Sequence, residues 1–155
     1  MSSPLLQALI AHFDSVYKGP NGDYAAVLEA LAGLTAAQAL WKPAPECNSI
    51  WQIVDHLTAS KNWQTEMLEK GQADFPAWTQ PTGGESAWQV SLAQLDAAHA
   101  RLLAALGKAP EENLLNVPNP EWKLTLLELL LSSAAHDAHH SGQIDYLKGL
   151  QARIS

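Results

Sequence analysis

The sequence contains only one cysteine, Cys47, and few basic residues. A single thiol cannot form a disulfide within the chain and lacks the paired spacing of a zinc knuckle, so a packed residue is favoured over a catalytic thiol. Lys and Arg total 9 against 16 Asp and Glu, which gives a formal net charge of -7. Such a surface repels phosphate backbones and anionic lipids, and we expect neither a nucleic-acid partner nor a membrane partner.

Long apolar runs and targeting signals are also lacking. The most apolar window, residues 124–135, is too short to cross a bilayer and contains Glu128. The first four residues carry no basic stretch before an apolar segment, so no signal peptide is expected and the predicted location is cytoplasmic. A chain of 155 residues, 47% hydrophobic and 16% charged, fits a single globular domain over residues 1–155.

Helical periodicity dominates the chain, and period-two alternation never extends beyond a few residues. Capping patterns at Ser3-Pro4, Thr35–Gln38 and Ser49–Gln52 predict helix starts. The expected long helices cover residues 4–18, 49–69, 86–106 and 123–150, with a short helix over 23–31, and Gly149 is expected near the end of the last one.

Four long amphipathic helices in a domain of this size can bury their apolar stripes together only as a bundle. The predicted fold class is therefore all-α, a four-helix bundle. Residues 71–85 and 107–120 are predicted loops that contain several prolines. These loops are longer than tight hairpins and permit a crossing connection, so a simple up-down-up-down order is not required.

Two of the six histidines have the spacing of a helical metal site. His136 and His140 lie one turn apart on one face of the last predicted helix, close enough to share an ion. The third ligand must come from another element, and His56 is the best candidate because Ser60 and Trp63 share its helix face. Three neutral imidazoles leave coordination positions for water or substrate, as in catalytic zinc sites. Spacing alone leaves a second interpretation open, in which these imidazoles simply hydrogen-bond within a core.

Two distant segments carry a further pattern. Residues 48–56 read Asn-Ser-Ile-Trp-Gln-Ile-Val-Asp-His, and the last helix carries His136-x-x-x-His140-x-x-Gln143. Together they resemble the DinB/YfiT-like superfamily of small bacterial metalloproteins, and the match in order and apolar pattern extends from about Leu5 to Leu150. The resemblance implies a four-helix bundle with an unusual helix order, one divalent metal bound by His56, His136 and His140, and a homodimer.

Four further side chains are candidates for supporting the metal or the substrate. Gln143 lies one turn beyond His140 and either orients a ligand or packs as a helix amide against its neighbour. Trp63 and Ser60 share the face of His56, and Trp78 lies in the loop before the third long helix. The two tryptophans are the proposed aromatic walls of a substrate cleft.

Three further residues are predicted to lie outside the metal and substrate sites. His139 points about 60° away from His136 and is expected on the helix surface or at a dimer edge. His99 falls on an inward stripe and is expected to be a hydrogen-bonded core histidine. Asp137 points about 100° away from His136 and is expected in solvent, with the alternative that it reaches a ligand from a second helix.

A metal with an open position acidifies bound water, polarises a carbonyl or holds a thiolate. Members of the resembled superfamily are mainly thiol-dependent S-transferases or isomerases, and others are described as metal-dependent hydrolases. The resemblance therefore implies an enzyme that activates a small thiol or water, with zinc or nickel as the expected metal and a small-molecule substrate. The alternative is a non-catalytic helical dimer that binds a small ligand or acts in a stress response.

Overall fold

The protein is described by a computed structural model that covers residues 3–154. Its long helices are α1 (Pro4–Lys18), α4 (Ile50–Lys70), α5 (Glu85–Lys108) and α6 (Leu126–Ile154). Shorter elements lie in the connections, namely α2 (Val27–Leu31), α3 (Ala36–Leu40) and the 3-10 helix η1 (Glu111–Leu115). No strand occurs within residues 3–154, and the predicted all-α bundle is confirmed.

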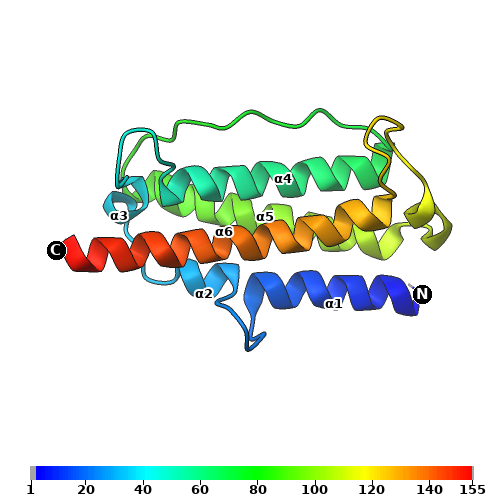
Figure 1. The fold of residues 1–155 in the computed structure, drawn as a ribbon, viewed down its shortest axis with the longest axis horizontal. Coiled ribbons are helices and arrows are strands. Elements are labelled where there is room, and N and C mark those ends of the chain that lie inside the picture. Colours follow the sequence, from blue (N-terminus) through cyan, green and yellow to red (C-terminus); the bar gives the residue numbers. More distant parts are fainter. Residues whose placement is uncertain (1–2, 155) are drawn as a thin grey trace.

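The long helices follow an up-down-down-up order (Figure 1). Helices α1 and α6 run in one direction, and α4 and α5 run in the other. Each of α4 and α1 packs against both α5 and α6, which closes the four-membered ring of the bundle. Because α4 and α5 are consecutive and parallel, residues 71–84 must return along the whole bundle, and we call them the crossover segment. Simple up-down-up-down order is thereby excluded.

The predicted helix starts form as the capping patterns indicated. The Ser3 hydroxyl accepts a hydrogen bond from the Leu6 amide at 3.2 Å, directly before Pro4. In the capping box at α4, the Gln52 amide donates to the Ser49 hydroxyl and the Ser49 amide donates back to the Gln52 side chain. These bonds satisfy backbone donors that the first helical turn leaves unpaired.

Both predicted boundaries of the last helix are wrong. Lys123 has a φ of 54°, which is incompatible with a right-handed helix, and α6 starts only at Leu126. A capping box that sequence reading missed sets this start. The Thr125 amide donates to the Glu128 carboxylate at 2.8 Å, and the Glu128 amide donates to the Thr125 hydroxyl at 3.2 Å. At the other end the helix continues through Gly149 to Ile154. Glycine costs a helix only about 1 kcal/mol, and packing of this turn on α2 outweighs that cost.

Two apolar clusters fill the ends of the bundle. One is built around Trp51 and Trp88, and the other around Phe13 and Leu102. Every long helix also contributes polar side chains, most of them buried, to the interior of the bundle. We call them the polar layer, and they comprise Asp14, Tyr17, Ser60, Lys61, Gln64, His99, Asp137 and His140. Burial of polar groups is costly unless they are paired, so this polar layer is where a functional site is expected.

Candidate metal centre

Three histidine side chains from two helices converge in the polar layer. The Nε2 atom of His136 lies 2.9 Å from Nε2 of His56 and 3.0 Å from Nε2 of His140. All three candidate ligand atoms lie within 4.8 Å of one another. The i, i+4 spacing on α6 and the packing of α4 on α6 bring these rings together. Among residues 3–154 this is the group of histidine, cysteine and acidic side chains that can hold a metal ion.

The donor set fits a transition metal. A tetrahedral ion with bonds of about 2.0–2.1 Å holds its nitrogen ligands about 3.3–3.4 Å apart, a few tenths of an ångström wider than the two shortest N···N distances here. One proton can be shared along only one of these contacts, whereas a cation accepts all three lone pairs. Burial, followed by repulsion from the neighbouring histidines, lowers the pKa of His56 and of His140 to about 4. Both rings are therefore neutral near pH 7, which is the form that binds metal.

Gln143 fixes the orientation of His140. The Nδ1 atom of His140 lies 2.7 Å from Oε1 of Gln143, so Nδ1–H donates to the amide oxygen and Nε2 keeps its lone pair for an ion. The amide nitrogen of Gln143 in turn donates to Nε2 of His139 at 3.1 Å. His139 is exposed and lies outside the three-histidine group. Hydrogen bonds of this kind set the ring tautomer at metal sites.

Asp137 is not in solvent as predicted. Its side chain is fully buried and forms an ion pair with Lys61 of α4, whose side chain is also fully buried. Burial alone would raise the pKa of the Asp137 carboxyl, but the charge and hydrogen bond of Lys61, together with the nearby His136, lower it below its ordinary value. Oδ1 of Asp137 lies 3.9 Å from Nδ1 of His136, so the carboxylate also places negative charge beside the His136 ring.

The crossover segment covers one side of the histidine group. The Trp78 ring stacks on His56 with 4.0 Å between centroids and 4° between planes, and Phe75 lies 6.0 Å from the same ring. Three hydrogen bonds tie the segment to α4: the indole of Trp63 donates to the Ala73 carbonyl, the Gln52 amide donates to the Thr79 carbonyl, and the Thr79 hydroxyl donates to the Asp55 carboxylate. Trp78 therefore packs on the His56 ring, and its predicted role as a wall of a substrate cleft stays a prediction. Phe75 is a neighbour that sequence reading missed.

The remaining histidines stay apart from the centre. His99 is buried, lies 3.1 Å from Oδ1 of Asp14 and stacks on Tyr17 with 3.9 Å between centroids. Burial first, and then the charge of Lys61, lowers the pKa of His99 to about 4. His99 is thus a core histidine with a carboxylate partner, in agreement with its predicted role. His12 is exposed on α1.

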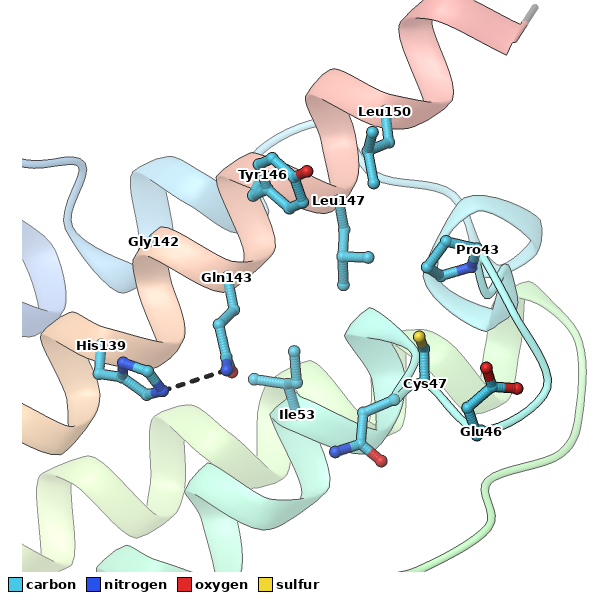
Figure 2. Close-up of a pocket in the computed structure, with 11 residues that line it drawn as sticks. Pro43, Glu46, Cys47, Ile53, His139, Gly142, Gln143, Tyr146, Leu147 and Leu150 are labelled. Atoms are coloured by element: carbon cyan, nitrogen blue, oxygen red, sulfur yellow. Dashed lines mark hydrogen bonds between the residues drawn. The ribbon is translucent and has the colours of Figure 1, made fainter.

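Two cavities flank the centre, and one of the clustered histidines lines the smaller one. The larger, of about 640 Å³, is lined by Cys47, His139, Gln143 and Leu147 among others, and none of the three clustered histidines lines it (Figure 2). The smaller, of about 170 Å³, lies among Ser60, Trp63 and His136. Ser60 and Trp63, the predicted substrate candidates, therefore line the same cavity as His136.

Comparison with known proteins gives one match. A family model described as the DinB superfamily matches residues 22–144, which is most of the chain and includes all three clustered histidines. No curated protein and no solved structure matches the chain. Within residues 3–154, no helix is both long and apolar enough to cross a membrane.

Proposed function

The chain belongs to the DinB superfamily, and on that premise we propose that it is a metal-dependent enzyme that activates a small thiol or a water molecule at His56, His136 and His140. The observation that carries the proposal is the convergence of three imidazole nitrogens with one side left open. The side chain of His136 is 31% exposed, whereas His56 and His140 are 7% and 6% exposed. A substrate therefore approaches beside His136.

A bound transition metal would supply Lewis acidity and lower the pKa of a coordinated thiol or water. The chain's own residues prepare the site for that role. Gln143 holds His140 with its Nε2 lone pair free, and the ring of Trp78 excludes water from one face of His56. Three protein ligands leave the further position that catalytic sites keep for a substrate. Zinc and nickel both suit an all-nitrogen donor set.

The first test is elemental analysis of protein purified without an affinity tag. We expect about one transition-metal equivalent per chain in the wild type and in His12→Ala, which removes an exposed histidine. The double variant His136→Ala/His140→Ala should retain none, while its helical circular dichroism stays close to that of the wild type. Full metal occupancy in the double variant would refute the proposed ligand set.

A second measurement separates the proposed activity from a non-catalytic role. Metal-loaded protein is incubated with a panel of electrophilic and ester or amide substrates, with and without a low-molecular-weight thiol. Turnover that requires the thiol supports an S-transferase, and turnover by water alone supports a hydrolase. The absence of both would favour the alternative of a helical ligand-binding dimer. The homodimer itself stays a prediction, which light scattering coupled to size-exclusion chromatography tests.

A further inference from the structure

The small cavity beside His136 has the position of a substrate subsite. It is formed by α4, the crossover segment and α6, and its volume is about 170 Å³. Of the three clustered histidines only His136, the most exposed one, lines it. Pockets for whole drug-sized ligands typically measure about 300–1,000 Å³, so this one accommodates a single functional group of a larger molecule.

Two residues that line this cavity carry buried polar atoms with no hydrogen-bond partner among the described residues. The hydroxyl of Ser60 and Oε1 of Gln64 make no hydrogen bond with any described residue, although Ser60 and Gln64 are only 2% and 4% exposed. The two residues lie one turn apart on α4, so they face the same space. Folded proteins rarely leave such groups unpaired, because each costs about 1–3 kcal/mol. The missing partner must therefore come from outside the chain.

The other lining residues define the chemistry of that partner. They comprise Trp63, Phe75, Leu129, Ser132, Ser133 and His136, and none of them is a lysine, an arginine or an acidic residue. The nearby ions Lys61 and Asp137 neutralise each other within the core. In the metal-free protein, a charged group in the cavity would lose its hydration without gaining a counter-ion from the lining residues. Trp63 and Phe75 meet edge to face at 5.5 Å and supply flat apolar walls.

We propose that this cavity binds a neutral, planar carboxamide group of the substrate. The carboxamide N–H would donate to Oε1 of Gln64, and its carbonyl oxygen would accept from the hydroxyl of Ser60. Both unpaired atoms are then satisfied, and the remainder of the molecule extends past His136. The inference rests on the proposed function only in this last respect, because the polar pair and the aromatic walls exist without a metal.

Three probes of matched shape test the assignment on the full chain labelled with nitrogen-15. Benzamide carries the carboxamide, acetophenone keeps the ring and carbonyl but lacks the N–H donors, and benzoate replaces the amide with a charge. The reporters are the side-chain amide resonances of Gln64 and the indole N–H of Trp63. We expect benzamide to shift both saturably, with a dissociation constant on the order of 10 mM for a ligand of this size. Acetophenone should bind about tenfold more weakly, because it leaves Gln64 unpaired.

Variants show whether the shifts come from this cavity. Gln64→Leu should weaken benzamide binding about tenfold, whereas Gln94→Leu, at an exposed glutamine of α5, should leave it unchanged. Ser60→Ala is the milder second variant, and it should weaken benzamide binding by a smaller factor. Equal binding of benzamide and acetophenone, or tighter binding of benzoate than of benzamide by metal-free protein, would overturn the carboxamide assignment. If no probe produces a saturable shift, the cavity holds only water and the proposal fails.

Zinc content measured on the same samples separates this inference from the metal centre. Protein that retains one zinc per chain and does not bind benzamide would overturn the subsite alone. Protein that binds benzamide through Gln64 without retaining any metal would support the subsite and overturn the metal centre. The two proposals can therefore fail independently.

Discussion

Replacement of Lys61 by methionine tests how the polar layer of the bundle is held together. The ammonium group of Lys61 on α4 pairs with the carboxylate of Asp137 on α6, and both side chains are fully buried. These are also the two helices that carry the clustered histidines. Methionine keeps most of the volume and the flexible stem of lysine, so the substitution removes the charge with little change in packing.

The expected loss follows from the burial of the pair. Without Lys61 the carboxylate of Asp137 has no cation within the core, and breaking a buried pair in this way costs about 3–5 kcal/mol. For a chain of this length a loss of 1 kcal/mol lowers Tm by about 2–4 °C, so Tm should fall by about 6–20 °C. The double variant Lys61→Met/Asp137→Asn removes both charges and should regain at least half of that loss.

The assay is denaturant unfolding of metal-free protein followed by far-ultraviolet circular dichroism. Metal must be absent because a ligand that binds only the folded state would add its own stabilisation. Lys70→Met is the matched control, since Lys70 lies on the same helix with its side chain 61% exposed and should change stability by at most about 0.5 kcal/mol. If Lys61→Met costs no more than this control, or if the double variant is less stable than the single one, the reasoning about the buried pair is wrong.

Three further predictions concern the centre and its surroundings. Gln143→Leu should reduce metal affinity about 10–100-fold in a chelator competition, because His140 loses the acceptor that orients it; affinity equal to that of Gln94→Leu would contradict this. The stability of the metal-free protein should decline as the pH falls from 6.5 to about 4, because the unfolded chain protonates His99 at its ordinary pKa of 6.5 while the folded state, with a pKa of about 4, does not. In His99→Gln the stability should fall less over this pH range. If thermal melts give the same change of Tm with pH for the variant as for the wild type, His99 is not the cause of the decline. Nickel or copper should quench tryptophan fluorescence mainly through Trp78, which stacks on His56 at 4.0 Å, so Trp78→Ala should lose the larger part of the quenching and Trp41→Ala should not.

Local rules were sufficient to predict most of the fold. The capping residues Ser3, Thr35 and Ser49 each act within four residues of their own position, and such short-range bonds can be read from sequence. The end of α6 depends instead on contacts with α2, which lies more than a hundred residues earlier in the chain. The Lys148 side chain, for example, donates to the Ala30 carbonyl at 2.7 Å. Gly149 predicted an earlier end of α6. The helix continues because of these contacts, which cannot be read from the sequence.

Asp137 shows where reasoning from a helix face fails. An angle of about 100° from a ligand places a residue in solvent only if the helix has one buried face. Helix α6 packs against α1, α2 and α4, so its buried arc is wide enough to include Asp137 as well as His140. The nearly continuous apolar run that begins this helix was a sign of such burial.

The clustered histidines could be predicted from the sequence, whereas some of the residues around them could not. The pair on α6 follows from i, i+4 spacing, and His56 was added by its helix face and by resemblance to a family. Phe75 carries no such signal, because the crossover segment has no periodicity from which the direction of a side chain can be inferred. Gln64 lies one turn beyond Ser60 and could have been grouped with it, but only coordinates reveal that both lack a partner.

Because α4 and α5 are parallel, the length of the bundle sets a minimum length for the crossover segment that covers the histidine group. Helix α5 has 24 residues and is about 36 Å long, and the 14 residues of the crossover segment can span at most about 46–50 Å. Only about three or four residues could be deleted before the ends no longer reach. Related chains with helices of equal length can therefore carry different side chains in the crossover segment, but they cannot have a much shorter segment. Diversity of specificity on this scaffold should consequently arise by substitution in this segment rather than by its deletion.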